Sequence, residues 1–351
     1  MKPTRISHLT AHFFCVTTCV LLLNTTYAQT IRRVNNNPGV TGLNVYTTAQ
    51  AAHDAAAAND IMIIEPSVTS YGDLVLTKPL KIYGNGYYLD TNTEQKADQR
   101  SSIVGIVSFN TGSGGSLISG LSPNTSTINI YGVSNITVRG CTGNINIYTR
   151  NAANTTNNNV SNILLTQNYS GGRVDSNPTT GFVISDVTLT NSIYDDVIAE
   201  ENPQNQNWVV RNNTFQVTAV TTIQLANAIF ENNILRGSGP AAIFTNVTHS
   251  YNVAAFAAFT GGVGNQNNYD LTNVFLGSGV GISDDEALQI KPGSPLKTAG
   301  SGGIEVGAYG GPTPYVVSGI PAIPSIVNMN NTATGSNTVP LSVTISVKSN
   351  N

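Results

Sequence analysis

The residues best suited to chemistry are acidic side chains that recur between positions 175 and 201. Carboxylate oxygens are the ligands that Ca²⁺ prefers in proteins. The candidate calcium ligands are Asp195, Asp196, Glu200 and Glu201, with Asp175 nearby in the sequence. The same spacing also fits acidic residues in solvated loops, and this alternative stays open. A second acidic run, at 284–286, is interpreted as a solvated turn.

Aromatic residues near these acids are the candidate sugar-binding groups. A tyrosine ring has a large apolar face and a polar edge, so an exposed ring can stack on a sugar. The candidates are Tyr148, Tyr169 and Tyr194. Their alternative role is ordinary packing beside a turn. The single tryptophan, Trp208, falls in a column of apolar residues and is expected in the core.

A repeat must position these groups. Six segments open on a polar residue, here called the marker, and successive markers are 27, 24, 21, 20 and 19 residues apart. The markers are Asn135, Asn162, Asp186, Asn207, Asn227 and Asn246. A β-rich stretch follows each marker, so the repeat predicts stacked coils of short strands around one core. The longer intervals hold extra residues at 150–159, 171–181 and 200–206, which predict loops stacked along one face.

Aligning the markers gives two apolar columns and one polar column. Side chains alternate between the two faces of a strand, so the apolar columns should face the core. The first is Ile136, Ile163, Val187, Trp208, Ala228 and Val247, and the second is Val138, Leu165, Leu189, Val210, Phe230 and His249. The polar column, here called the ladder, is Cys141, Asn168, Ser192, Asn213, Asn233 and Asn252. Asparagine tolerates left-handed turns, and its amide both donates and accepts, so stacked copies should bond to one another. Cys141 is expected to be a buried structural thiol.

The start of the chain predicts a leader followed by a cap. Residues 1–28 are expected to be a secretory signal peptide, since Lys2 and Arg5 precede an apolar stretch and a small residue ends it. A T-x-x-Q capping box that begins at Thr47 predicts a helix over 48–58. Apolar runs at 61–64, 74–76 and 80–83 predict strands. The helix should cover the open end of the stack.

These features resemble the right-handed parallel β-helix proteins of the pectin-lyase-like class. The resemblance rests on the capping helix with the strand at 60–64, on 81–90 (KIYGNGYYLD) and on the ladder, and it covers roughly 47–311. The stretch at 291–311 is similar to the closing segment of secreted bacterial β-helix proteins of unassigned role. The resemblance implies a substrate cleft beside the stacked loops, where a linear polysaccharide can run parallel to the axis of the stack.

The resemblance also implies two kinds of enzyme. In the lyases, calcium neutralises a uronate carboxylate while an arginine or lysine removes the adjacent proton, which needs a base whose pKa is lowered. Arg150 and Arg173 are therefore the candidate catalytic residues. The hydrolases use a Gly-His-Gly and an Arg-x-Lys element, and this chain has neither. Its histidines beyond the leader, His53 and His249, are interpreted as structural.

Composition argues against other classes of function. Only 10% of residues are charged, against roughly 25% in ordinary globular domains. The net charge is −3, or −5 without Lys2 and Arg5 (14 basic against 19 acidic residues), so we expect no nucleic-acid partner. The apolar stretch at 13–23 is shorter than the roughly 20 residues of a membrane span. Of three cysteines, only Cys141 would remain after the leader, so no internal disulfide is expected.

We therefore expect an all-β chain that folds as a right-handed parallel β-helix. Its expected parts are a signal peptide (1–28), the β-helix domain (29–311) and a proline-punctuated tail (312–351) whose last apolar alternation, at 341–347, predicts a strand. The expected function is a non-catalytic glycan-binding or structural role, outside the cell or at its surface, as a monomer. The alternative is a calcium-assisted lyase that acts on uronic-acid polysaccharides.

Overall fold

The structure of the chain is a computed structural model that describes residues 29–92, 98–123, 127–170, 172–198, 205–217, 223–332 and 334–348. The expected signal peptide lies outside these residues. The described chain is mostly β, and its helices are α2 (Ala49–Ala55) and the short 3-10 helices η1 (Glu286–Leu288), η2 (Pro295–Thr298), η3 (Ser301–Gly303) and η4 (Val317–Gly319). No helix within the described ranges has the length and apolar character needed to cross a membrane.

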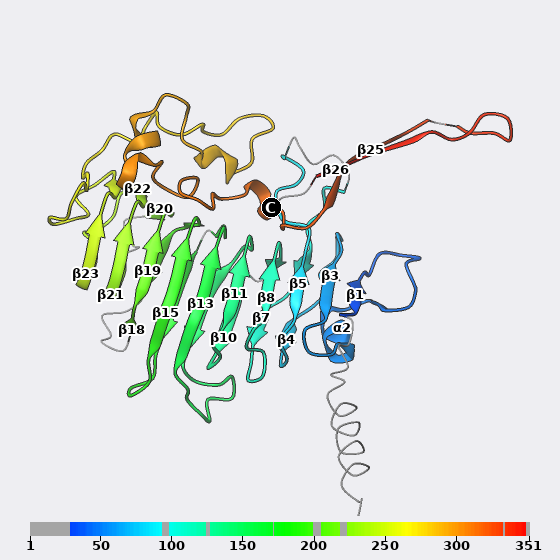
Figure 1. Cartoon of the computed structure of the whole chain (residues 1–351), viewed down its shortest axis with the longest axis horizontal. Helices are drawn as coiled ribbons and strands as arrows, with labels where there is room; N and C mark the ends of the chain where they lie inside the picture. Colours follow the sequence, from blue (N-terminus) through cyan, green and yellow to red (C-terminus); the bar gives the residue numbers. More distant parts are fainter. Residues whose placement is uncertain are drawn as a thin grey trace, which may run out of the picture. The chain divides into compact units, whose positions relative to one another are not determined.

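Most strands of the described chain belong to one parallel sheet of 18 strands (Figure 1). They are β1 (Ile31–Val34), β2 (Val45–Tyr46), β3 (Ile61–Ile64), β4 (Leu74–Leu76), β5 (Lys81–Tyr83), β7 (Val107–Phe109), β8 (Leu117–Ser119), β10 (Thr127–Tyr131), β11 (Ile136–Arg139), β12 (Asn144–Tyr148), β13 (Val160–Thr166), β14 (Arg173–Asn177), β15 (Ile184–Thr190), β17 (Asp196–Ile198), β18 (Asn205–Gln206), β19 (Trp208–Arg211), β21 (Gln224–Glu231) and β23 (Ile243–Ser250). Parallel strands need long connections, and here the connection is one repeat of the sequence.

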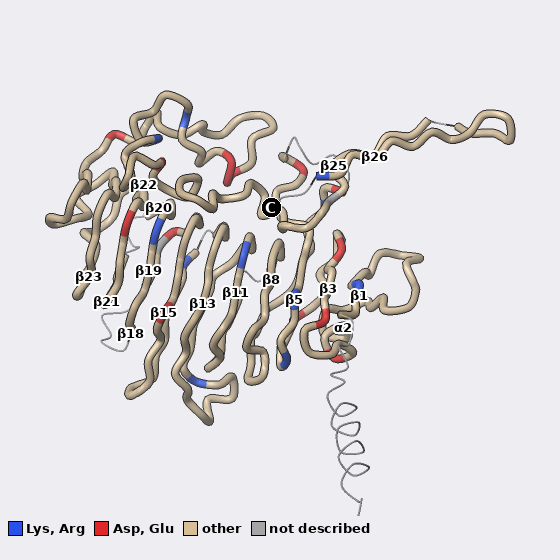
Figure 2. The backbone as a smooth tube through the Cα atoms, viewed as in Figure 1, with Lys and Arg blue, Asp and Glu red and all other residues tan. Residues whose placement is uncertain are grey.

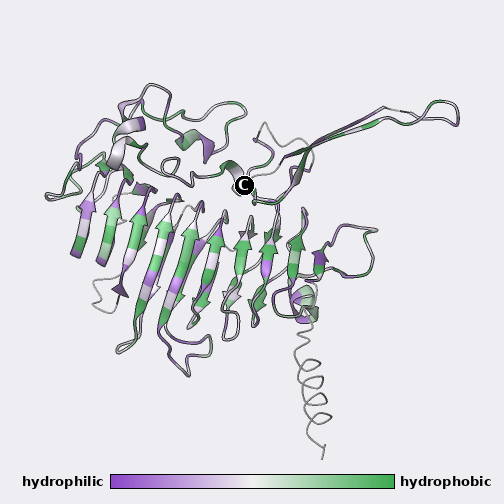
Figure 3. Ribbon diagram, viewed as in Figure 1, coloured by the Kyte–Doolittle hydropathy of each residue, from purple (hydrophilic) through white to green (hydrophobic). Residues whose placement is uncertain are grey.

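Strands one repeat apart lie side by side. β11 pairs with β13, β13 with β15, β15 with β19, β19 with β21 and β21 with β23, all in parallel. This register stacks Ile136 on Ile163 and Ile163 on Val187, which builds the first apolar column. The strands carry the apolar residues of this core in alternation with polar ones (Figure 3). Both columns are buried up to Phe230, while Val247 and His249 on the last strand are half-buried.

Left-handed backbone occurs at two places in each repeat. All six markers have a φ between 50° and 62°, so each marker bends the chain between two short strand segments. The second place is the residue before each ladder position: Gly140, Gln167, Asn191, Asn212, Asn232 and Tyr251. The sequence suggested this geometry for the ladder residues themselves, and the structure moves it one residue earlier, because the ladder side chain must turn inward.

The ladder residues form one buried column. Each ladder oxygen accepts the backbone N–H of the preceding rung, at 2.9 to 3.1 Å, in the order Cys141, Asn168, Ser192, Asn213, Asn233 and Asn252. All six residues are at most 1% exposed. The column continues at Asn265, whose Oδ1 accepts the Asn252 N–H at 3.0 Å. The sequence did not predict this rung, since it follows Asn252 by only 13 residues.

Helix α2 is shorter than expected and is capped differently. Thr48, not Thr47, is its N-cap, and the Thr48 hydroxyl accepts from the Ala51 N–H at 3.2 Å. Gln50 does not close a capping box, because its Oε1 accepts the Val75 N–H at 2.8 Å and so ties the helix to β4. His53 is buried and accepts the Thr77 N–H at 3.1 Å through Nε2, which agrees with a structural role.

Three smaller sheets complete the described strands. Two are parallel, one formed by β16 (Ile193–Tyr194), β20 (Thr214–Val217), β22 (Ile234–Gly237) and β24 (Val253–Ala254), the other by β6 (Ile103–Val104) and β9 (Ser122–Pro123). The third is an antiparallel hairpin of β25 (Ser325–Asn331) and β26 (Val343–Lys348). The hairpin lies within the expected tail, and β26 overlaps the strand predicted at 341–347.

The segment that follows β24 covers the outer face of the four-stranded sheet. Ile234 and Val253 pack there against a cluster that includes Val306, and Ile193 packs against Ala308 and Tyr315. The acidic run at 284–286 belongs to this cover and is not simply a solvated turn. Asp285 is fully buried, and its Oδ2 accepts the Ser318 N–H at 2.7 Å and the Tyr315 hydroxyl at 2.9 Å.

Candidate functional site

Two of the predicted site residues lie at the end of β12: Tyr148 is its last residue and Arg150 follows it, next to the neighbouring strand β10. Tyr131 and Tyr148 pair in register, and their rings stack with centroids 5.0 Å apart. The Arg150 guanidinium lies 4.4 Å from the Tyr148 ring centroid and 5.4 Å from that of Tyr131. Such cation–π contacts hold an arginine against its neighbours. Arg150 is therefore held by tyrosine rings, and Tyr148, which is half-buried, packs against Tyr131 and Arg150.

The second candidate arginine and the acids occupy the next strands. Arg173 begins β14 with an exposed side chain, and its N–H donates to Asn144 Oδ1 at 3.0 Å. Its register partner on β17 is Asp196. Asp195 is half-buried, and burial raises the pKa of its carboxyl group. The Asp196 side chain, Glu200 and Glu201 lie outside the described part of the chain; within that part, no group of three or more His, Cys, Asp or Glu could hold a metal.

The other two predicted tyrosines have different environments. Tyr194 is 0% exposed and belongs to the core, so its ring has no surface for a ligand. Its strand position directs it inward, beside the ladder. Tyr169 is half-buried and lies edge-on to Tyr88 with ring centroids 5.5 Å apart. Tyr169 lines two hollows of the surface, one on the side of Tyr88 and one on the side of Arg236.

A polar column that the sequence reasoning missed runs through these hollows. It consists of the third residue after five of the six ladder rungs: Asn144, Asp195, Gln216, Arg236 and Ala255; the corresponding residue after Asn168, Gly171, lies outside the described residues. Ladder side chains point inward, and the strand that follows alternates, so this position faces outward. Gln216 and Arg236 are register partners on β20 and β22, and Arg236 donates to Gln216 Oε1 at 3.2 Å.

Three hollows follow one another along this column. Their volumes are about 390, 370 and 420 Å³. The first and second share Tyr169, and the second and third share Arg236, Leu271 and Thr272. Neighbouring parallel strands are about 4.8 Å apart, so a row that crosses seven strand positions, from Ser122 to Ala255, is about 29 Å long. We call this row the polar groove.

One wall of the polar groove comes from the covering segment. The second hollow is closed by Phe275, Ser278 and Asp284, and the third by Asn268, Tyr269 and Asp270. Charged residues are sparse on the parallel strands, whereas the covering segment carries several acids (Figure 2). The covering segment therefore brings the carboxylates of Asp270 and Asp284 to one wall of the groove, while the strand wall offers Gln216 and Arg236.

Arg236 is the main cation of the polar groove. Its guanidinium lies 4.7 Å from the Phe275 ring centroid, and burial lowers its pKa while the nearby Tyr169 raises it. In the described part of the chain, Arg236 makes no ion pair. A fixed, half-buried guanidinium without a carboxylate offers donors to an incoming oxygen. The sequence could have revealed Arg236 in two steps, first by aligning the ladder residues and then by counting three residues on from each rung.

Comparisons with protein-family models, with curated proteins and with solved structures found no match to this chain.

Proposed function

We propose that the chain is a secreted, non-catalytic β-helix protein that binds a glycan in the polar groove. The fold part of this proposal is a right-handed parallel β-helix of the pectin-lyase-like class. It is supported by strand pairing one repeat apart, by the buried ladder and by helix α2 packed beside β4. Handedness follows from a general rule, since parallel crossover connections are right-handed in about 98% of cases.

The row of three connected hollows is the observation that carries the binding part. A chain of sugars needs an extended site that offers an aromatic ring and several hydrogen-bonding groups, and the groove supplies Tyr169, Gln216 and Arg236 along a row of strands. The groove is continuous because Tyr169 and Arg236 each line two hollows. Arg236 favours a glycan that carries acidic groups, since its guanidinium has no carboxylate partner among the described residues.

A binding role fits the candidate arginines better than a lyase role. The Arg150 guanidinium is stacked on the Tyr131 and Tyr148 rings. A base for proton removal must instead be able to reach the substrate proton. Arg173 is the first residue of β14, and its side chain is exposed. These placements favour binding without bond cleavage.

The test measures binding of the full chain to a panel of soluble neutral and acidic polysaccharides. Arg236→Gln should weaken binding of the acidic members about 10- to 100-fold, which is the effect of losing one charge-assisted hydrogen bond of about 1.5 to 3 kcal/mol. Tyr169→Leu should weaken binding of all members. The matched control is Arg173→Gln, an arginine outside the groove, which should bind as the wild type does.

Two results would contradict the proposal. One is no binding to any polysaccharide at millimolar glycan. The other is ultraviolet absorbance of an unsaturated product when the wild type is incubated with Ca²⁺ and a uronic-acid polysaccharide, with loss of that absorbance in Arg173→Gln. The second result would establish the lyase alternative and the role of Arg173.

A further inference from the structure

A further cavity shares no lining residue with the polar groove. It has a volume of about 680 Å³, within the roughly 300–1,000 Å³ typical of ligand sites. One wall comes from β3 and the loops near it, and the other comes from the root of the tail, at 320–329. We call this cavity the tail cleft. Its lining residues are Ile63, Ile64, Glu65, Pro66, Gly84, Asn85, Asp98, Arg100, Ile320, Pro321, Ile323, Pro324, Ile326 and Met329.

Aliphatic side chains dominate the tail wall of the cleft. Ile320, Ile323, Ile326 and Met329 come from this wall, and Ile63 faces them from β3. Ile326 is 46% exposed and Met329 is 60% exposed, so the wall leaves apolar surface in water, where its burial by a ligand is favourable. Among the described residues, no aromatic side chain on which a sugar could stack lines the cleft.

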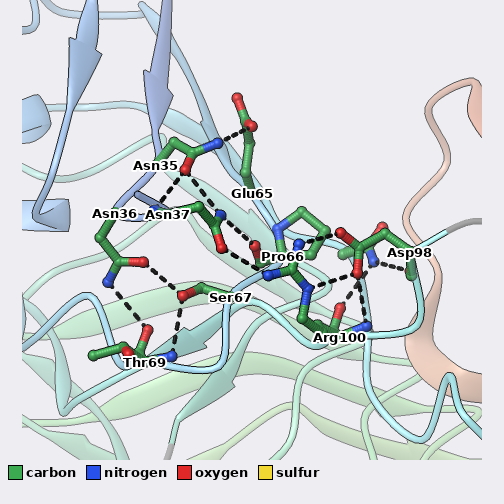
Figure 4. A network of polar contacts seen from close by, with 10 residues as sticks. Asn35, Asn36, Asn37, Glu65, Pro66, Ser67, Thr69, Asp98 and Arg100 are labelled. Carbon is green, nitrogen blue, oxygen red and sulfur yellow. Dashed lines mark hydrogen bonds and ion pairs between the residues drawn. The ribbon is translucent and has the colours of Figure 1, made fainter. Parts of the chain in front are cut away.

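The rim of the cleft is polar, but its groups already have partners. Arg100 donates to both carboxylate oxygens of Asp98, and its NH1 donates to Asn37 Oδ1 at 2.7 Å (Figure 4). Glu65 accepts from Asn35 in the same network (Figure 4) and also from Arg33. The two carboxylates are matched by two arginines. A charged ligand would have to displace these pairs, so the rim favours a ligand with an uncharged polar end.

Contacts at the base of the tail hold the two walls in place. The Tyr87 N–H donates to Ser318 O at 2.9 Å, and the Ser318 N–H donates to Asp285. Gly86 has a φ of 98°, and a Cβ there would collide with Ser318 O. Pro321 and Pro324 then fix the backbone of the tail wall. The cleft is therefore formed before any ligand arrives, which lowers the entropy cost of binding.

We propose that the tail cleft binds the straight aliphatic chain of an uncharged amphiphile, with its polar end at the Asp98–Arg100 rim. The volume of the cleft limits the length of the aliphatic chain that it can hold, and the paired charges of the rim favour a ligand with an uncharged polar end. This site is separate from the polar groove, so the proposal does not depend on glycan binding.

The test titrates the full chain with a homologous series of straight-chain primary alcohols, which carry no sugar that could enter the groove. Affinity should rise about fourfold for each added methylene, because each buried CH₂ adds a constant hydrophobic increment. The rise should stop when the chain fills the cleft. The fatty acid of matched length should bind more weakly than the alcohol.

Variants locate the binding. Ile323→Asp and Met329→Asp each place a charge on the tail wall and should weaken binding of the longest alcohol at least about tenfold. Val280→Asp is the matched control, since Val280 is a fully exposed apolar residue that does not line the cleft. Far-ultraviolet circular dichroism of each variant checks that it folds, and Met329→Asp changes an exposed position that the fold tolerates.

Three results would overturn the proposal. The first is an affinity that does not depend on chain length. The second is equal weakening by Val280→Asp and Ile323→Asp. The third is a concentration-dependent dimer that takes up no alcohol, because a second copy would then fill the cleft.

Discussion

Removal of one ladder amide should destabilise the fold by about 2 to 4 kcal/mol. In the wild type, Asn213 Oδ1 accepts the Ser192 N–H at 3.0 Å, and its Nδ2 donates to Leu189 O and to Arg211 O at 2.9 Å each. Asn213→Ala leaves the buried Ser192 N–H without an acceptor, which costs roughly 1 to 3 kcal/mol. The lost bonds to the two carbonyl groups and the small cavity add about 1 kcal/mol more.

The chain itself supplies the matched variant. Ser192 fills the same register, and its hydroxyl oxygen accepts the Asn168 N–H at 3.1 Å. Asn213→Ser should therefore keep an acceptor for the Ser192 N–H and should recover about 1 to 2 kcal/mol of the loss. Asn337→Ala, an exposed residue of the hairpin loop, is the control for loss of an amide in water.

Urea unfolding followed by tryptophan fluorescence measures this effect. Trp208 is the only tryptophan, is 0% exposed and lies five residues before Asn213, so its emission reports on this repeat. With a slope of roughly 3 kcal/mol per molar urea, the midpoint of Asn213→Ala should fall by about 1 M. Equal midpoints for the alanine and serine variants, or for Asn213→Ala and Asn337→Ala, would refute the reasoning, because the amide would then not be satisfying a buried donor.

The remaining predictions concern other buried groups. Burial raises the pKa of the Cys141 thiol to about 12 from its usual 9.0, so a thiol reagent at pH 8 should label Cys141 only after unfolding, as measured by the mass of the peptide that contains Cys141. Because only the unfolded thiol ionises between these values, the free energy of unfolding should fall as pH rises from 9.0 to about 12. Asp285→Ala should lower the free energy of unfolding, measured by thermal denaturation, by about 1 to 3 kcal/mol, because the Ser318 N–H loses its acceptor. Asp285→Asn should lose less stability. Equal losses in the two variants would show that the side-chain oxygen of Asp285 is not needed as an acceptor.

The sequence predicted those parts of the fold that repeat. The strand at Ile61–Ile64 has the predicted bounds, and the two apolar columns stack in the observed register, because a period-two pattern specifies which face is buried. The ladder positions were also visible as a column. Positions outside the repeat were missed. Asn265 joins the ladder from a loop, and the buried Asp285 accepts from Ser318, which lies 33 residues further along the chain.

The candidate site was harder to predict than the fold for a physical reason. Side chains on the outer face of a strand are not held to one chemical type, so Asn144, Gln216 and Arg236 share a column without resembling one another. The sequence analysis placed the candidate site in the loops because acidic residues are concentrated there. The hollows instead depend on how the covering segment packs on the strands, and this long-range packing has no periodic pattern in the sequence.

The ladder and the polar groove are consequences of the same turn. The buried ladder side chain fixes the conformation of the turn in each repeat. A shift of the register by one residue would leave a backbone N–H without an acceptor in each repeat that shifted. The residue three places on is then fixed in its outward position, and the strand spacing of about 4.8 Å fixes the distance to the next one. A rigid row of this kind suits recognition of a repeating ligand, because each strand meets the ligand at a regular interval. The specificity for a ligand should therefore depend on the outward column, above all on Gln216 and Arg236, while the ladder fixes the positions of the residues in that column.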